Sequence, residues 1–144
     1  MESNNKQPIT IENIVNAPIE KVWELWNGPR HIEKWNSPSE DWHTPHAEND
    51  LRPGGKIKSR MEAKDKSQGF DFEGTYDAVE KPKYISYTMS DGRKVKVNFS
   101  AKNNGTMVME TFDPEEINSL EMQQAGWQAI MDNFKKYAES SSNQ

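Results

Sequence analysis

The spacing of the apolar residues changes once along the chain, and this change limits which folds are possible. Between about residues 56 and 112, apolar side chains alternate with polar ones, as in residues 94–99. From Ser119 to about Glu139 the apolar residues instead recur with a helical period. Alternation predicts strands with one buried face, and the helical period predicts an amphipathic helix. A sheet with an apolar face must cover it, and only this last helix is long enough to do so.

Two residues stand out on the apolar face of the predicted C-terminal helix. Gln123 is polar and lies near the middle of the face, and Gly126 beside it removes side-chain volume. A buried amide needs a hydrogen-bond partner, and a glycine costs about 1 kcal/mol of helix propensity. These two residues therefore suggest that this face of the helix partly borders a cavity and is not fully packed. The alternative is that Gln123 bonds to neighbouring backbone and Gly126 permits a close crossing. The whole predicted face consists of Leu120, Met122, Gly126, Trp127, Ile130, Met131, Phe134, Tyr137 and Ala138.

The segment before the alternating residues predicts one strand and two short helices. Ile9–Glu12 alternates like a strand, and Pro18 is suited to the first turn of a helix. A second short helix is expected from Arg30 to Trp35. Residues 36–49 are rich in Ser, Pro, Asp and His, and they predict an ordered loop that carries Trp42.

Turn signals within the alternating segments predict how the strands pair. They are Gly54-Gly55, Asp91-Gly92 and Asn104-Gly105, and such short connections imply antiparallel pairing. The predicted fold class is α+β, with a curved antiparallel sheet of about six to seven strands and two short helices after the first strand. The long C-terminal helix lies across the concave face. We expect one domain over residues 8–139, with flexible ends at residues 1–7 and 140–144.

Composition excludes several classes of function. The chain has 144 residues, a mean hydropathy of −1.04 and a net charge of −5. An acidic domain of this kind is poorly suited to binding nucleic acid. No apolar run approaches the length of a membrane span, and no signal-peptide pattern is present. The absence of cysteine removes disulfides, thiol catalysis and Cys-based zinc sites, and it fits a cytoplasmic location.

The sequence offers little support for catalysis or for a cofactor. His43 and His46 form a His-x-x-His pair, but in a predicted loop such a pair is weak evidence for a metal site. No nucleophile-elbow or phosphate-loop motif is present. Asp71, Glu73 and Glu110 lie in predicted strands, with the first two directed outward, and no inward acid or base is identifiable. We therefore expect no metal, no cofactor and no catalytic residue.

The inward positions of the strands and of the last helix favour ligand binding instead. They combine aromatic rings and methionines with a few polar groups, as small-molecule pockets usually do. Trp26 is a further candidate for the mouth of such a cavity. The alternative is that these side chains simply pack. The predicted ligand-binding residues are Trp35, Trp42, Met61, Phe70, Phe72, Tyr76, Tyr87, Met89, Phe99, Gln123, Trp127 and Ile130.

Several short sequence motifs resemble motifs of a known superfamily. They are the segment Val15–Trp23, the turn Asp50–Gly55, Phe72–Gly74 with Tyr76, and Gly126-Trp127 on the last helix. In order and spacing they are similar to the helix-grip superfamily, also called START-like, Bet v 1-like or SRPBCC. The turn at Asp50–Gly55 resembles the branch named after the activator of the heat-shock-protein-90 ATPase. The resemblance covers about residues 8 to 138 and implies a helix-grip fold.

The resemblance does not decide the function, because this superfamily includes ligand carriers, cyclase-type enzymes and a co-chaperone domain. Our first hypothesis is the binding or carriage of a small apolar ligand, lipid-like or aromatic, between the sheet and the last helix. The second is a chaperone-linked interaction module, which the branch name implies together with a role in the stress response. The third is a cyclase or hydratase that uses the same pocket. We expect no nucleic-acid partner and no membrane span.

Overall fold

The computed structural model describes residues 7–140. The chain begins with β1 (Ile9–Val15), α1 (Ile19–Asn27) and α2 (Pro29–Trp35). Six further strands and one long helix follow, namely β2 (Trp42–Asn49), β3 (Lys56–Ala63), β4 (Gly69–Glu80), β5 (Tyr84–Met89), β6 (Lys94–Lys102), β7 (Gly105–Phe112) and α3 (Leu120–Glu139).

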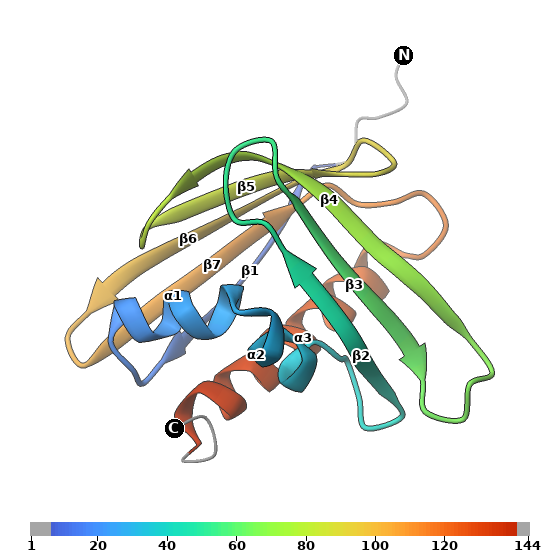
Figure 1. Ribbon diagram of the computed structural model, residues 1–144, viewed down its shortest axis with the longest axis horizontal. Helices are drawn as coiled ribbons and strands as arrows, with labels where there is room; N and C mark the ends of the chain where they lie inside the picture. Colours follow the sequence, from blue (N-terminus) through green and yellow to red (C-terminus); the bar gives the residue numbers. More distant parts are fainter. Residues whose placement is uncertain (1–6, 141–144) are drawn as a thin grey trace.

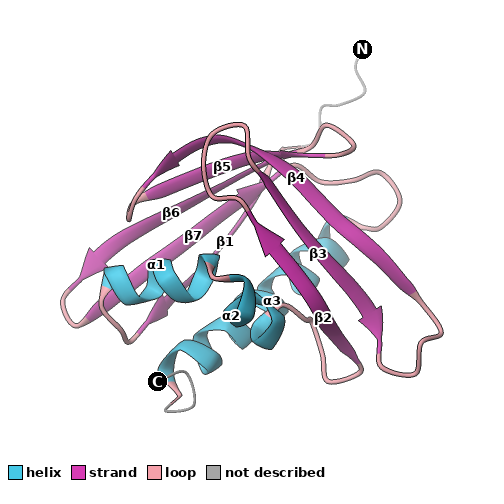
Figure 2. Cartoon of the chain, in the orientation of Figure 1, coloured by secondary structure: helices cyan, strands magenta, loops and turns pink. Residues whose placement is uncertain are grey.

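The seven strands form one antiparallel sheet in the order β1-β7-β6-β5-β4-β3-β2. Each strand from β2 to β6 therefore lies next to the one that follows it in the sequence, and β1 pairs with β7 at the far end. Figure 1 shows the sheet curling around the helices, with α3 on its concave side. Figure 2 shows that all three helices lie on this side of the sheet. The predicted fold class, an α+β helix-grip, is confirmed.

An aromatic cluster joins the three helices at one end of the concave face. Phe134 of α3 is fully buried, and its ring lies edge-on to both Trp26 of α1 and Trp35 of α2, with centroids 4.9 Å apart in each case. Met131 and Ala138 extend the buried face of α3 on either side of Phe134. The second half of α3 is thus fixed to the core by packing of large side chains.

The predicted C-terminal helix is confirmed, with one correction at its start. Ser119 is the N-cap, and its hydroxyl oxygen accepts a hydrogen bond from the Met122 N–H at 3.1 Å. Leu120 and Met122 were expected on the apolar face, but they are 44% and 63% exposed. The reason is that α3 becomes buried only from Gln123 onward, so its first turn extends beyond the packed core.

The prediction of a loop over residues 36–49 is wrong for its second half, which forms the edge strand β2. The register of β2 against β3 shifts between His43 and His46, and this irregularity breaks the alternation by which a strand is recognised. Pro45 lies within the irregular segment. A proline is tolerated there because a missing N–H costs little at a sheet edge or bulge.

The predicted flexible ends lie almost wholly outside the described residues, which include only Gln7 and Ser140 of them. Between these two residues, no helix is long and apolar enough to cross a bilayer.

Removal of the Phe134 ring should test the anchoring of α3. We expect Phe134→Ala to lower the free energy of unfolding by about 3–5 kcal/mol, because it opens a cavity beside two tryptophans. Met122→Ala is the matched control on the same helix, and its exposed side chain predicts a change within about 0.5 kcal/mol. Urea denaturation of both variants measures the difference. Equal midpoints for the two variants would show that α3 is not anchored at Phe134.

Candidate functional site

A cavity of about 360 Å³ lies between the concave face of the sheet and the first half of α3. Strands β3, β4, β5 and β7 supply one wall, α3 supplies the opposite wall, and α1, α2 and the segment after α2 close one end. The lining is mainly aromatic and aliphatic, which is typical of small-molecule sites. Phe70 lies at the rim, where its side chain is about half exposed.

The cavity brings together most of the residues that the sequence predicted for it. Tyr76 and Phe99 do not line it, although both point inward. The Tyr76 hydroxyl donates to Asn49 Oδ1 at 2.6 Å, while Phe99 packs edge-on against Trp23 and Trp26. The predicted residues that do line the cavity are Trp35, Trp42, Met61, Phe70, Phe72, Tyr87, Met89, Gln123, Trp127 and Ile130, and the further candidate Trp26 joins them.

Sequence reasoning missed several lining residues, of which the polar ones matter most for chemistry. Gly126 also borders the cavity, as expected for a residue that leaves space because it has no side chain. The missed residues are Ile32, Asn36, Pro38, Ile57, Ser59, Ile85, Arg93, Glu110 and Glu115.

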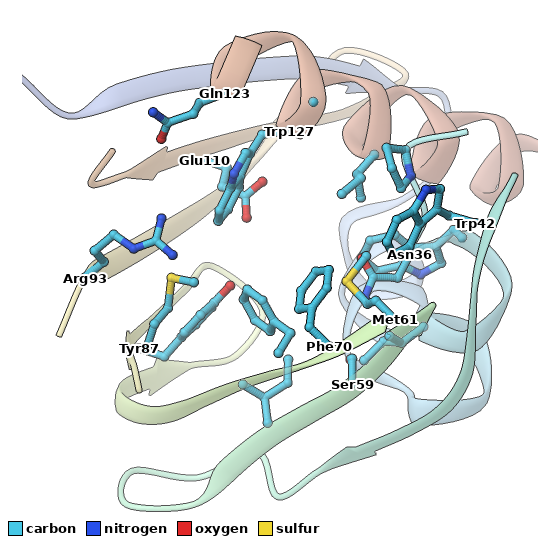
Figure 3. A pocket seen from close by; sticks show the side chains of 18 of the residues that line it. Asn36, Trp42, Ser59, Met61, Phe70, Tyr87, Arg93, Glu110, Gln123 and Trp127 are labelled. Atoms are coloured by element: carbon cyan, nitrogen blue, oxygen red, sulfur yellow. The ribbon is translucent and has the colours of Figure 1, made fainter. Parts of the chain in front are cut away.

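The two ends of the cavity differ in polarity. Figure 3 shows Glu110, Tyr87 and Arg93 directed toward one end. At the other end lie Trp42 and Phe70, together with Met61. The cavity is therefore suited to an elongated ligand with one polar group and an apolar body.

Glu110 is the most unusual residue of the lining. It lies on β7 between Ile11 of β1 and Val97 of β6, and it is only 6% exposed. No hydrogen bond or ion pair within residues 7–140 engages its carboxyl group. Burial raises the pKa of Glu110 from its ordinary value of 4.5 to about 8. At neutral pH the carboxyl group is therefore mostly protonated, since desolvation disfavours the charged form.

The expectation that no acid or base points inward is therefore wrong. Glu110 shares its side of β7 with Thr106, Val108 and Phe112, all of which are buried. The other side of β7 also carries apolar residues, including two methionines, so the strand shows no clear alternation. The sequence did contain one indication that Glu110 points inward. It lies two residues from Val108 and from Phe112, and residues two apart in a strand share a face.

Tyr87 of β5 is the second polar group at this end. Its ring packs edge-on against Phe72 and Tyr76, and Gly74 makes room for it, because a Cβ at Gly74 would lie 2.7 Å from the Tyr87 ring. Burial and the nearby charge of Glu110 raise the pKa of the Tyr87 hydroxyl well above its usual value. Tyr87 is thus neutral at physiological pH and can donate or accept a hydrogen bond.

Gln123 lines the cavity, but its amide is already engaged. Its Oε1 accepts from the Glu115 N–H at 2.8 Å, and its Nε2 donates to the carbonyl oxygens of Asn118 and Glu115 at 2.8 and 3.2 Å. Of the two explanations for a buried glutamine, the structure shows the bond to neighbouring backbone. Gln123 therefore fixes the segment before α3, and one lone pair of its oxygen remains for a ligand.

Arg93 and Glu115 border the polar end, and both are held by neighbours. Arg93 Nε donates to Asp91 Oδ2 at 2.8 Å. The Glu115 carboxylate accepts hydrogen bonds from the backbone N–H groups of Ile117 and Asn118. These bonds and the positive charge of Arg93 outweigh partial burial and lower the pKa of Glu115, which stays ionised at neutral pH.

Gly126 and Trp127 shape the wall that α3 contributes. A Cβ placed on Gly126 would find no atom within 4 Å, so the space beside it is open. Trp127 stacks on Phe112 of β7, with ring centroids 3.9 Å apart and an interplanar angle of 9°. The stack joins the helix to the sheet, and Trp127 lines the cavity beside Glu110 (Figure 3).

The histidine pair lies on β2 rather than in a loop. His46 contacts Glu48 at 2.8 Å, and His43 lies 3.6 Å from Glu62. Across the part of the chain that the structure describes, no group of three or more His, Asp or Glu side chains could hold a metal ion. The pair has no partner set that would make it a metal centre.

The buried carboxyl group predicts a specific pH dependence of stability. The pKa of Glu110 is raised on folding. The contribution of its protonation to the free energy of unfolding is therefore complete below about pH 4.5 and is lost as the pH rises to about 8. The Glu110→Gln variant stays neutral at every pH. As the pH rises through this window, its free energy of unfolding should therefore increase relative to that of wild type by up to about 1.4 kcal/mol per pH unit. Urea denaturation at several pH values measures the difference. Glu80→Gln, at an exposed site of β4, is the control, and parallel curves for Glu110→Gln and wild type would contradict a raised pKa.

The chain is similar to proteins of known sequence and structure over nearly its whole length. The family described as Activator of Hsp90 ATPase homolog 1-like protein matches residues 16–139. An AHSA1-like protein from Aeromonas hydrophila, with a solution NMR structure, is 47% identical, with 96% of each chain covered and a TM-score of 0.89. Chr148 from Cytophaga hutchinsonii is 49% identical, with coverage of 98% of this chain and 96% of that chain and a TM-score of 0.81.

More distant similarity supports the fold alone. A protein from Chromobacterium violaceum is 22% identical over 94% of this chain and 100% of its own, with a TM-score of 0.84. A search of curated proteins finds no match. The helix-grip resemblance noted in the sequence is confirmed by the family match, which runs from the residue after β1 to the end of α3. The chain belongs to the family of Activator of Hsp90 ATPase homolog 1-like proteins.

Proposed function

We propose that the protein binds a small, largely apolar ligand in the cavity between the sheet and α3. The observation that carries this proposal is the cavity itself, whose 360 Å³ are lined mainly by aromatic and aliphatic side chains. Its volume falls within the range of small-molecule sites, about 300–1,000 Å³. A normally packed protein interior would leave no void of this volume, because voids larger than a water molecule are few in protein interiors.

The polar groups support binding in a preferred orientation. Glu110 and Tyr87 are each 6% exposed and line one end of the cavity. A buried polar group without a partner is costly, so a ligand that bonds to it gains affinity. The ligand's polar group would face Glu110 and Tyr87, and its apolar body would contact Met61 and Trp42 at the other end.

The second candidate is a chaperone-linked interaction, as the family description suggests. An exposed apolar group at the start of α3 favours it, since Ile117, Leu120 and Met122 are 91%, 44% and 63% exposed. Exposed apolar groups of this kind can mark protein contact sites. We rank this candidate second because three side chains make a small patch compared with a stable interface.

Acid–base catalysis is the third candidate, because Glu110 is an inward carboxyl group with a pKa near neutrality. Among the described residues, no second group orients this carboxyl group. Binding therefore remains the first proposal.

A filled cavity should not bind ligand. NMR titration with a panel of small aromatic and acyl compounds, cationic, neutral and anionic, should shift the resonances of Tyr87, Trp127 and Ile130. Gly126→Phe should abolish these shifts, because the new ring occupies the open space beside the helix. Gln124→Phe adds the same ring at an exposed position of α3 and should leave binding unchanged.

Shifts restricted to the outer-face residues Lys56, Lys58 and Lys96 would overturn the cavity proposal and favour the interaction module. Thermal melts of both phenylalanine variants establish that each one folds. If Gly126→Phe does not fold, the location of the shifts in the unmodified protein still decides between the two candidates.

A further inference from the structure

The carboxyl group of Glu110 is buried at the polar end of the cavity, and no residue of the described chain bonds to it. It is 6% exposed, and burial alone accounts for its altered protonation, with no hydrogen bond or neighbouring charge contributing. Its nearest neighbours in the sheet, Ile11 and Val97, are apolar. The carboxyl group borders the cavity, where a ligand can offer it a hydrogen-bond donor or a cation.

The charges around Glu110 show which kind of ligand would bind there. Arg93 is the cation that lines the cavity, but Asp91 already pairs with it at 2.8 Å. Glu115 also lines the cavity, and it is ionised at neutral pH because its pKa is lowered. The positive charge of Arg93 acts on both Asp91 and Glu115, because it forms an ion pair with the first and helps to lower the pKa of the second. At the polar end Glu110 is thus left without a cation, and the arginine that could bind an anion already pairs with Asp91.

The side chains next to Glu110 are suited to a cation in a second way. Trp127 stands beside it on α3, and Tyr87 faces it from β5. Aromatic faces attract ammonium groups, most strongly where water is excluded. The other residues of α3 that line the cavity, Gln123, Gly126 and Ile130, carry no charge that could replace such a ligand.

We propose that the ligand of this cavity is an amine with an apolar body, whose ammonium group pairs with the Glu110 carboxylate while its body lies against the aromatic lining. This inference rests on the proposed binding function and adds the chemical class of the ligand. The Tyr87 hydroxyl is placed to accept a second hydrogen bond from the same ammonium group. A carboxylate ligand would lie beside Glu110 and Glu115 and is disfavoured.

Binding of the amine releases one proton. In the empty protein below about pH 8 the carboxyl group is mostly protonated. The free amine is already an ammonium ion, because an alkylamine resembles lysine and has a pKa of about 10. Pairing forms a carboxylate and keeps the ammonium ion, so the Glu110 proton passes to solvent. The charges balance, because the ammonium ion brings one positive charge into the site and one proton leaves.

The affinity for the amine therefore rises with pH. It should increase about tenfold from pH 6 to pH 7 and about fivefold from pH 7 to pH 8, and then level off as Glu110 ionises in the empty protein. The groups that face Glu110 do not titrate in this range. The pKa of Tyr87 lies well above it, and that of Glu115 lies below its ordinary value.

Three probes with the same aromatic body test the proposal, namely naphthylethylamine, naphthylethanol and naphthylacetate. Isothermal titration calorimetry at pH 8 should find the amine at least about tenfold tighter than the alcohol, because its hydrogen bond is charge-assisted. The acetate should bind most weakly. At pH 7, titration of the amine in two buffers of different ionisation enthalpy should reveal the release of about one proton per ligand.

Two variants locate the effect. Glu110→Gln keeps the shape of the side chain but cannot ionise, so its affinity for the amine should fall to that for the alcohol and should lose its pH dependence. Its affinity for the alcohol should change by less than about threefold. Glu80→Gln removes one exposed carboxyl group elsewhere on the sheet and should leave all three affinities unchanged.

The outcomes distinguish the amine proposal from the proposal that the cavity binds a ligand at all. If none of the three probes binds and the cavity resonances stay fixed, the binding function itself is overturned. If the alcohol binds but the amine is no tighter at pH 8, or if the acetate is the tightest, the cavity binds ligands and the amine proposal is wrong. Proton release is measured on the unmodified protein, so its absence overturns the amine proposal even if Glu110→Gln fails to fold.

Discussion

The packing of Phe134 against both Trp26 and Trp35 is the contact on which the rest of the structure depends. It fixes the second half of α3 to the two short helices, and those helices are in turn attached to the sheet. The first half of α3 is joined to the sheet through Trp127, which stacks on Phe112 of β7. Apart from Gln123, its residues are exposed or half-buried, and Gly126 leaves open space toward the sheet. The cavity lies beside this first half of α3, whereas the second half is packed into the core by Met131, Phe134 and Ala138.

The same arrangement explains why a carboxyl group can remain buried. Glu110 lies where the sheet faces the first half of α3, so its side chain meets the cavity rather than packed atoms. Burial there favours the protonated form, and a neutral acid costs less than an unpaired charge. The carboxyl group borders the cavity, so a ligand of the right charge can bind to it there. Membership of the family does not by itself assign this chemistry, because ligand specificity resides in side chains such as Glu110 and not in the fold.

Gln123 connects the cavity to the exposed end of α3. Its three hydrogen bonds hold the backbone of Glu115 and Asn118, and these residues lie next to the exposed Ile117. A ligand that contacts Gln123 would thus touch the residue that fixes this segment. The two leading candidate functions, small-molecule binding and protein contact, involve neighbouring parts of the same helix end.

The sequence by itself determined the fold class, the long helix and most of the apolar lining, because these depend on the local spacing of large side chains. It did not determine β2, whose bulge destroys the alternation, or the exclusion of Phe99 and Tyr76, which other side chains cover. The inward position of Glu110 was missed because β7 carries apolar residues on both faces, which hides the spacing that Glu110 shares with Val108 and Phe112. Only the tertiary structure decided that one of these faces meets a cavity, since that depends on how α3 lies over the sheet. The raised pKa of Glu110 follows from that position, because desolvation is a property of the surroundings and not of the residue.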